Sequence, residues 1–476
     1  MNDAIFADLL KREVVPEERR LPEQVAPALT ALAARLGVVL GDNPRHAIEA
    51  MIAEIDRAMS QLINLILHHP DFQQLESVWR GLFFAVQGIE TGPSLKVKAI
   101  DISKRELVRT LRKFRGTAWD QSPLFRKVYE EEYGQFGGEP FAVLIGGYEF
   151  DHSPPDVQLL NDLAQIAAAA HAPFIAAASP SVMQMDSWNE LANPRNLTAI
   201  FQTPEYAPWR SLRASEDARY LGLCLPRFLA RLPYGSRTEP VEAFEFEEEV
   251  DGPDASRFLW GNPAFAMGAN IARAFYLYGW CVRIRGIDGG GVVEDLPSYH
   301  FPTADGDVDL RCSTEVALSE RRESELAMNG FIPLVHRKNA DYPAFIGAPS
   351  LQKPREYDDP SATMNAALSA RLPYMFATSR FAHYLKCMVR DKVGSTSSRA
   401  QLNRWLEDWI DQYIDGSPDT SSDEWKASHP LAQAEVHVEA SDDAPGKYEA
   451  KFFLRPHYQL EGVTAMVRLV SRLASP

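Results

Sequence analysis

The stretch "EPFAVLIGGYEF", residues 139–150, is a short, continuous apolar run that ends in glycines and an aromatic pair, and it is typical of a strand buried on both faces. The periodic stretch "PPDVQLLNDLAQIAAAAHAP" (154–173) then predicts a helix, and "FIAAAS" (174–179) predicts a second buried strand. Strand, helix and strand in this order predict a parallel βαβ unit with a right-handed crossover. The expected fold class is therefore α/β, of a mixed α+β kind.

Two amphipathic helices are predicted upstream of this unit. Apolar residues recur at three- and four-residue steps between Ile48 and Ile66, and again between Phe72 and Val86. Pro70 separates the two patterns, because proline is tolerated at the first turn of a helix but not in its interior. Residues 45–92 are therefore expected to form a helical hairpin.

The junction between these helices contains the polar cluster "HHPD", residues 68–71. Adjacent helix positions lie about 100° apart around the axis, so His68 and His69 cannot converge on one metal ion. We predict that the two histidines close the first helix and that Asp71 caps the second. Trp79 is assigned to the packed face of the second helix.

The regions on either side of the hairpin differ in character. Residues 1–44 carry a short apolar cluster, a proline-punctuated charged stretch and a modest helical pattern, which is typical of an arm or linker. Residues 95–103, "LKVKAIDIS", alternate like a strand. Residues 93–390 are assigned to a central α/β region with room for two subdomains.

Residues 391–430 contain one strong amphipathic helix and a polar linker. The helix lies in "SSRAQLNRWLEDWIDQYIDGSP" (397–418), with serines at its start and Gly416 at its end. Its aromatic stripe is predicted either to sit in the core of the chain or to pack on a partner. The partner-packing candidates are Trp405, Trp409 and Tyr413.

The last segment, residues 431–476, reads as a small antiparallel sheet. Three alternating stretches are predicted to be strands, and "SDDAPG" (441–446) is a turn between the first two. A sheet of so few strands leaves open edges to which strands of other subunits can add. The candidate residues of such an inter-subunit sheet are Val436, Val438, Tyr448, Phe452, Leu454, Val463 and Val467.

Composition excludes several classes of function. The chain has 49 basic and 65 acidic residues and a net charge of −16, so a nucleic acid or an anionic membrane surface would be repelled. The amino terminus lacks the basic and apolar regions of a signal peptide, and no run approaches the roughly 18 apolar residues of a spanning helix. The four cysteines are far apart, which disfavours a disulfide framework or a zinc site. A cytoplasmic location is expected.

Catalytic motifs are absent from the sequence. Gly146–Gly147 lacks the G-x-G-x-x-G pattern, and no Lys-Ser/Thr follows the glycines at 289–291. His152 stands beside an aspartate and a serine, but catalytic triads are assembled in space and seldom from neighbours in sequence. We predict no catalytic residue, cofactor or metal. The alternative is a cytosolic α/β enzyme with a site at the carboxyl ends of the strands near Gly146, Gly147 and Glu149.

Several long stretches together resemble one family, the large sheath subunit of the bacterial type VI secretion system (TssC/VipB family). The resemblance rests on "IAEIDRAMSQLINLILHHPDFQQLESVWRGL", "PFAVLIGGYEFDHSPPDVQLL", "WRSLRASEDARYLGLCLPRFLARLPYG", "FLWGNPAFAMGANIARAFYLYGWCVRIRGIDGGGVVEDLP" and "LSERRESELAMNGFIPLVHRKNADYPAFIGAPSLQKP". These stretches occur in family order, and the resemblance extends from about residue 45 to the end of the chain. The amino-terminal 44 residues match less distinctly.

The resemblance implies a contractile-tail sheath fold and a structural, non-enzymatic role. It implies a heterodimer with a small sheath subunit of the TssB/VipA type, stacked with neighbouring copies into a helical sheath around an inner tube of hexameric rings. It further implies a baseplate on which the sheath assembles, and a Clp-class ATPase that disassembles the contracted sheath. A phage-type tail sheath protein shares this logic but is usually a single subunit.

A physical hypothesis accompanies this resemblance. A sheath that shortens must move its subunits without disconnecting them, and a sheet shared between subunits holds while the rigid bodies tilt. We therefore predict strand exchange through the carboxy-terminal sheet, with residues 1–44 as an arm that extends to a neighbour.

Overall fold

The structure of the protein is a computed structural model that describes residues 21–39, 44–193, 196–250, 255–302, 305–337, 340–392, 398–418, 420–440, 448–457 and 467–472. The chain divides into two compact units. Unit 1 comprises Met1–Glu76, Arg231–Leu259 and Phe301–Val308, and unit 2 comprises Ser77–Ala230, Trp260–His300 and Asp309–Pro476. The boundary near the amino terminus falls inside helix α4, Pro70–Gln87.

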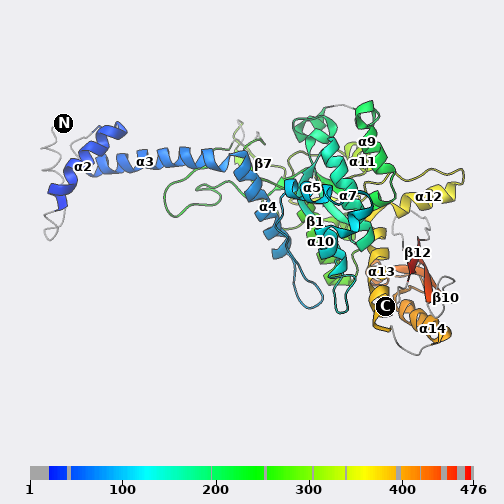
Figure 1. Ribbon diagram of the computed structural model, residues 1–476. Helices are drawn as coiled ribbons and strands as arrows, with labels where there is room; N and C mark the ends of the chain where they lie inside the picture. Colours follow the sequence, from blue (N-terminus) through cyan, green and yellow to red (C-terminus); the bar gives the residue numbers. More distant parts are fainter. Residues whose placement is uncertain are drawn as a thin grey trace. The chain divides into compact units, whose positions relative to one another are not determined.

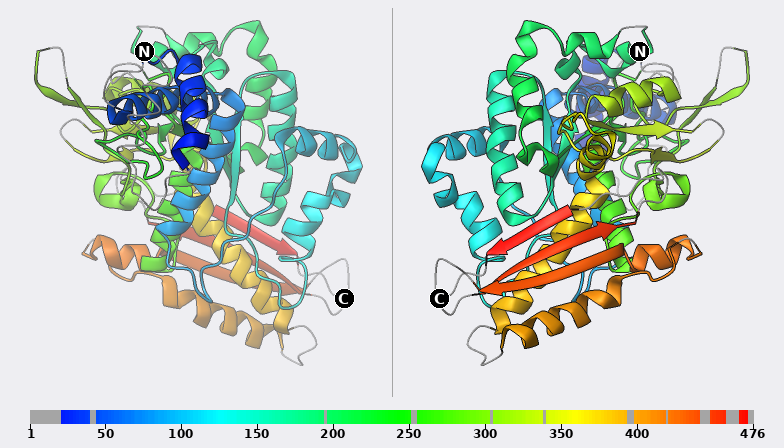
Figure 2. Two further views of the ribbon diagram at one scale, coloured as in Figure 1. Left: turned by 90° about the vertical axis from the view of Figure 1, so that its left-hand side faces the viewer. Right: turned by 90° about the vertical axis from the view of Figure 1, so that its right-hand side faces the viewer.

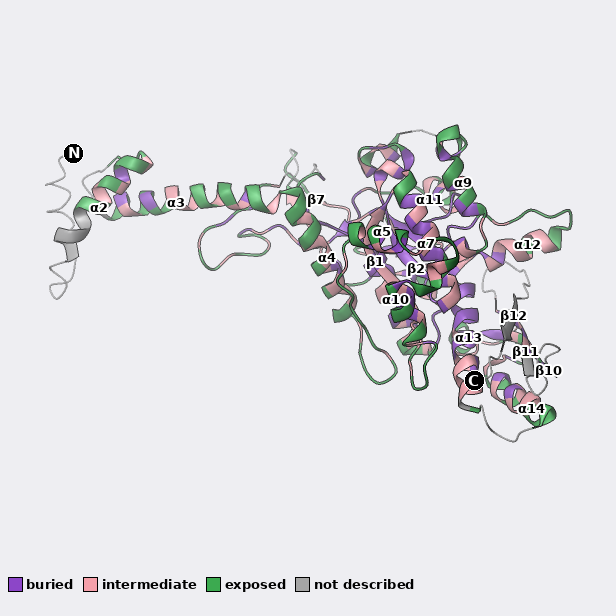
Figure 3. Cartoon of the chain, in the orientation of Figure 1, coloured by how far each residue is buried: buried purple, intermediate pink, exposed green. Residues whose placement is uncertain are grey.

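Unit 1 contains helix α2 (Leu21–Leu36), helix α3 (Pro44–Leu67) and the first two turns of α4. Ala33, Ala47 and Met51 are buried where α2 and α3 pack. Other apolar side chains of α3 are exposed, so the helix carries green and purple segments in alternation (Figure 3); they include Ile52, Met59, Leu62, Leu65 and Ile66. The predicted arm falls partly outside the described residues, and its residues 21–36 form α2.

The predicted break between α3 and α4 is confirmed, because α3 ends at Leu67 and α4 begins at Pro70. The predicted capping was wrong in one respect. The Asp71 amide donates to Nδ1 of His69 at 3.3 Å, so the imidazole accepts at the start of α4 and the carboxylate of Asp71 lies in the first turn. Packing of the two helices as a hairpin stays a prediction. Trp79 is 64% exposed, so its assignment to a packed face is wrong for the isolated chain.

The core of unit 2 is a five-stranded sheet of order β1-β2-β3-β8-β9. The first four strands are parallel and β9 is antiparallel to β8. The strands are β1 (Leu144–Phe150), β2 (Phe174–Ala178), β3 (Leu221–Leu225), β8 (Phe331–His336) and β9 (Pro343–Phe345). Helix α7 (Pro154–Ala170) connects β1 to β2, which confirms the predicted βαβ unit.

Both faces of this sheet are covered by helices (Figure 1). Alternate residues of β2 face opposite ways: Phe174 and Ala176 join a core with α7, whereas Ile175 joins a second core with α10 (Pro263–Tyr278) and α13 (Leu372–Lys392). β2 is fully buried, and β1 is half-buried with apolar contacts on both faces, which explains why both strands read as continuous apolar runs. Pro263 stands at the first turn of α10, and the side chain of Asn262 caps that helix.

Shorter elements complete unit 2 and the segments that link it to unit 1. The helices are α5 (Lys104–Arg112), α6 (Pro123–Phe125), α8 (Leu197–Ile200), α9 (Ala207–Ala214), α11 (Glu320–Met328), α12 (Pro360–Ser369), α14 (Arg399–Ile410) and α15 (Asp423–Ser428). The short strands are β4 (Phe228–Leu229), β5 (Trp260–Gly261), β6 (His300–Pro302) and β7 (Val308–Leu310).

The predicted strand at residues 95–103 was wrong. Residues 95–102 form an irregular, extended segment, here named the strap, which precedes α5. Val97 and Ile100 are 46% and 50% exposed. Apolar and polar residues do alternate along the strap, but a strand also needs a neighbour for its backbone hydrogen bonds. No described strand pairs with the strap.

The carboxy-terminal part of unit 2 is a separate three-stranded antiparallel sheet of order β10-β11-β12. The strands are β10 (Leu431–Ala440), β11 (Tyr448–Pro456) and β12 (Val467–Arg472), as the sequence predicted. Figure 2 draws them as orange-to-red arrows next to α13 and α14. Ser398 caps α14 through a capping box, which confirms the predicted start of that helix.

Candidate inter-subunit surfaces

The carboxy-terminal sheet has one face buried against its own chain. Val436 lies opposite Phe452, and both are 2% exposed or less. They share an apolar core with Leu406 and Ile410 of α14 and with Phe381 of α13. A one-residue slip of a strand would turn its buried side chains, such as Val436 or Phe452, to solvent. The buried face therefore sets the register of the sheet.

Most of the predicted sheet residues can be placed. Val436, Val438, Phe452 and Leu454 are buried in this core, so their side chains hold the sheet on α13 and α14. Tyr448 begins β11 and Val467 begins β12, and they are placed here by backbone alone. Val463 lies outside the described residues. Because these side chains are used within the chain, another subunit could add a strand only through the backbone hydrogen-bonding groups at the edge of the sheet.

The opposite face of the sheet is polar. Lys451 pairs with Glu439 at 2.5 Å across β10 and β11, and Arg455 donates to Gln433 at 3.2 Å. Such cross-strand pairs on an exposed face add little stability but keep the face hydrated. The sheet is therefore buried on one face and polar on the other.

The two outer strands of the sheet differ in how their edges are covered. β10 lies against α14, where the Val438 amide donates to Oδ1 of Asn403 at 3.0 Å. Among the described residues, β12 pairs with β11 alone. An edge strand with one partner presents unpaired backbone groups, so β12 is the better candidate for strand addition.

The aromatic stripe of α14 contacts the core of its own chain. The Trp409 ring lies 5.9 Å from Phe381 and 5.1 Å from Tyr413, and Trp280 lies 5.2 Å from Tyr413. Trp405 packs against the same core. All three stripe residues remain half-exposed. These contacts agree with the prediction that the stripe packs in the core of its own chain. Packing of the exposed parts of the three side chains on a partner stays a prediction.

A buried aspartate fixes the start of the sheet. Asp415 is 3% exposed, and its carboxylate accepts from the Ser417 amide at 3.0 Å and the Ser421 hydroxyl at 2.8 Å. Burial opposes ionisation, but these two donors hold the pKa of Asp415 below its ordinary value. The Asp415 amide also donates to the Leu431 carbonyl at 2.8 Å, so the turn after α14 and the first residue of β10 are bound together.

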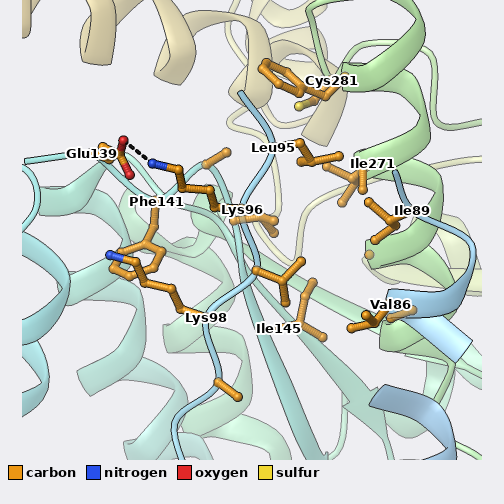
Figure 4. Close-up of a pocket in the computed structure, with 18 of the residues that line it drawn as sticks. Val86, Ile89, Leu95, Lys96, Lys98, Glu139, Phe141, Ile145, Ile271 and Cys281 are labelled. Carbon is orange, nitrogen blue, oxygen red and sulfur yellow. Dashed lines mark hydrogen bonds and ion pairs between the residues drawn. The ribbon is translucent and has the colours of Figure 1, made fainter. Parts of the chain in front are cut away.

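A second surface in unit 2 is an apolar groove of about 740 Å³ beside β1 (Figure 4). Its walls are the strap, the segment that enters β1 and the end of α4. Ile145, Ile271 and Cys281 line its interior. At its rim Lys96 pairs with Glu139 at 2.5 Å. Sequence reasoning missed this groove, because its lining comes from four separate parts of the chain.

Unit 1 holds a buried charge cluster that sequence reasoning also missed. Arg231 binds Glu248 through Nη1 at 2.6 Å and Glu76 through Nε at 2.8 Å. His68, at the end of α3, lies 3.4 Å from the Glu248 carboxylate. Arg231 and Glu76 are separated by 155 positions in the sequence, so no local pattern reveals the pair. The cluster ties the corner between α3 and α4 to residues 231–250.

The carboxyl end of β1, where the enzyme alternative placed a site, is occupied by internal ion pairs. Lys104 Nζ lies 2.6 Å from Asp156 Oδ2 and 2.6 Å from the Glu149 carbonyl oxygen. Arg227 binds Glu315 in a bidentate pair at 2.8 and 2.9 Å. These cations are neutralised by the chain's own carboxylates, which is typical of structural pairing.

The glycines and histidines at this end are structural as well. A Cβ on Gly146 would lie 2.5 Å from the Phe174 ring, so the glycine serves strand packing rather than phosphate binding. His152 contacts the Ser181 carbonyl at 2.9 Å and stacks on Tyr206. Across the described ranges, no group of three or more metal-ligating side chains gathers. Nor does any described helix have the length and apolarity needed to cross a membrane.

The described residues combine a mixed α/β fold, internally paired charges and a terminal sheet whose outer strand β12 has one strand partner. Comparison with known families specifies the class. A family profile described as "EvpB/VC_A0108, tail sheath N-terminal domain" matches residues 49–352, and one described as "EvpB/VC_A0108, tail sheath gpW/gp25-like domain" matches residues 361–473. The chain belongs to this VipB family of tail sheath proteins.

A curated relative agrees with this assignment. The "Type VI secretion system sheath protein TssC1" of Pseudomonas aeruginosa PAO1 is 60% identical over 473 residues, which covers 99% of this chain and 95% of the relative. The chain is therefore a structural subunit of the type VI secretion sheath and not an enzyme. A chain in a cryo-EM structure of the anti-feeding prophage baseplate, 12% identical with a TM-score of 0.34, covers 81% of both chains and is too distant to add to the assignment.

Proposed function

We propose that this chain is the large member of a sheath heterodimer, which polymerises around an inner tube and propels the tube by contraction. The observation that carries the proposal is the carboxy-terminal sheet, in which β12 has one strand partner among the described residues. Its buried face fixes the register, and its edge is left to a strand from a neighbouring subunit. The family assignment supports a sheath role for such an edge.

The partners of this function are a small sheath subunit of the TssB/VipA type and neighbouring copies of this chain. Others are the hexameric protein of the inner tube, the baseplate and a Clp-class ATPase that disassembles the contracted sheath. The work takes place in the cytoplasm, without nucleic acid and without insertion into a membrane. Residues 1–44 serve as the arm that reaches the next subunit.

The test is co-expression with the small subunit, followed by negative-stain electron microscopy. The full chain should yield a soluble heterodimer and tubules. A chain that lacks residues 1–44 and a chain that ends before β12 should each give the heterodimer without tubules. Normal tubules from either truncation would contradict strand exchange, and failure of the full chain to bind the small subunit would contradict the heterodimer itself.

A further inference from the structure

The groove beside β1 has the free edge of a sheet along one wall. β1 is the outermost strand of the five-stranded sheet and, among the described strands, is hydrogen-bonded to β2 alone. The side chains that reach its backbone act from Gly146 onward: Asn262 donates to the Gly146 and Tyr148 carbonyls at 3.4 and 3.1 Å, and Lys104 donates to the Glu149 carbonyl at 2.6 Å. Residues 141–143 and Ile145, which also border the groove, receive no side-chain hydrogen bond on their backbone within the described part of the chain, and the register of β1 shifts after Ile145.

The opposite wall is the strap, which is also extended and unpaired. Within the described part of the chain, residues 96–101 make no backbone–backbone hydrogen bond. The strap is nevertheless held in place. Lys96 and Lys98 pair with Glu139 and Glu132, and the Tyr148 hydroxyl donates to the Ile102 carbonyl at 2.6 Å. The strap is therefore a fixed wall, and the backbone N–H and C=O groups of residues 96–101 make no backbone hydrogen bond within the described part of the chain.

Between these walls lie about 740 Å³ of space and an apolar lining that includes Ile145, Ile271 and Cys281 (Figure 4). An extended peptide could bond to β1 on one side and to the strap on the other, with alternate apolar side chains directed at the lining. Because the strap lysines are already neutralised by glutamates, the occupant needs no acidic residues. These features fit a β-strand.

No described strand of this chain is free to fill the groove. The described strands that could fill the groove are already paired within the central sheet or the carboxy-terminal sheet. Ile5, Phe6, Leu9 and Leu10, in the amino-terminal segment outside the described residues, have the spacing of a helix face rather than of a strand. We propose that a strand of the small sheath subunit inserts between β1 and the strap. This inference rests on the heterodimer proposed above.

The test is hydrogen exchange measured by mass spectrometry on the co-expressed heterodimer, with the denatured complex as reference. Amides of residues 96–101 and 141–143, for which the structure shows no backbone partner within the described part of this chain, should exchange at least tenfold more slowly than in the reference. In a matched pair of variants, Val97→Pro removes one strap amide, whereas Val97→Thr keeps it. The proline variant should lose the protection at 141–143, and the threonine variant should retain it. Val97 is 46% exposed, so neither change disturbs a core.

A photo-crosslinker at position 97 identifies the occupant. A crosslink to the small subunit supports the proposal, and the same group at Met328, a residue of α11 that is 72% exposed, is the background control. If the heterodimer forms but residues 96–101 exchange at the reference rate, the groove proposal is wrong while the heterodimer stands. A crosslink to a second copy of this chain overturns the proposal too. Absence of any heterodimer overturns both proposals.

Discussion

Arg231 and Glu248 form a bidentate ion pair in which both side chains are withdrawn from water, 3% and 1% exposed. The Nη1–Oε2 and Nη2–Oε1 distances are 2.6 and 3.1 Å. Each charge would be strongly unfavourable alone in this environment, so the two residues depend on each other. Glu76 completes the cluster from the start of α4.

Arg231→Met should therefore destabilise unit 1 by roughly 3–5 kcal/mol, because it leaves two carboxylates without their cation. The matched control is Arg257→Met, whose pair with Glu249 is 51% and 58% exposed and should contribute less than about 1 kcal/mol. The measurement is urea denaturation together with hydrogen exchange across residues 44–76. Equal effects of the two substitutions would show that the cluster is not a stabilising centre.

Two adjacent residues of β11 allow a sharp test of the carboxy-terminal sheet. Phe452 is 1% exposed and faces the core, whereas Phe453 is half-buried on the polar face. Phe452→Asp should cost more than about 4 kcal/mol and unfold the sheet, because it buries an unpaired charge. Phe453→Asp should cost roughly 1 kcal/mol. Limited proteolysis reports unfolding of the sheet, and a protease-resistant Phe452→Asp chain would contradict the assigned register.

Substitution of Trp409 separates its two predicted roles. Its ring contacts Phe381 and Tyr413 at 5.9 and 5.1 Å, so Trp409→Ala should destabilise the chain itself by about 2–4 kcal/mol. Trp425, which is 51% exposed and stacks on His429, is the control, and its replacement by alanine should cost less than about 1.5 kcal/mol. Thermal denaturation of the chain without its partner measures the effect. Unchanged stability combined with loss of partner binding would assign Trp409 to an interface.

A pH dependence follows from a buried histidine. Burial, and then the charge of Lys386, lower the pKa of His171 to about 4, from its ordinary value of 6.5. Only the unfolded chain takes up this proton between these values, so the folded state loses stability as the pH falls from 6.5 towards 4. The loss approaches roughly 3 kcal/mol by pH 4. Above pH 6.5 the histidine is neutral in both states and has no effect.

His171→Asn should remove this part of the pH dependence. The residue has φ of +52°, a conformation that asparagine tolerates, so the substitution does not strain the backbone. His69→Asn, in which the parent side chain is 60% exposed, is the control and should keep the acid sensitivity of the parent. Denaturation midpoints at pH 7, 5.5 and 4.5 give the comparison. Parallel curves for the parent and the His171→Asn variant would contradict a neutral, buried His171.

The βαβ unit and the carboxy-terminal sheet could be predicted from the sequence, because each is encoded in the spacing of apolar residues along a short stretch. The βαβ unit was predictable because β2 is buried on both faces and β1 has apolar contacts on both. The terminal sheet was predictable because buried and more exposed residues alternate along β10 and β11. The corner at Pro70 and a serine-capped start of α14 were predicted from single residues, and the structure shows the cap to be Ser398. The family resemblance, carried by long contiguous strings, supplied the function.

The remaining features depend on partners far apart in the sequence. Arg231 meets Glu76 across 155 positions, and the groove combines α4, the strap, β1 and α10. The strap was mistaken for a strand because alternation records which side chains can face a sheet, not whether a neighbouring strand is present. Burial of Trp79 was expected from helical periodicity alone, which cannot reveal an exposed apolar face.

Helix α13 connects the two cores of unit 2. Its first half, with Leu372 and Phe376, packs in the core of the central sheet, and its second half, with Phe381 and Leu385, packs in the core of the carboxy-terminal sheet. A helix is stiff along its axis because its backbone hydrogen bonds run in that direction. A pull on the terminal strands therefore has a direct load path into the central sheet. Mechanical tension on the terminal sheet can therefore pass along α13 as along a rod, and a break in this helix would weaken the transfer of force to the central sheet.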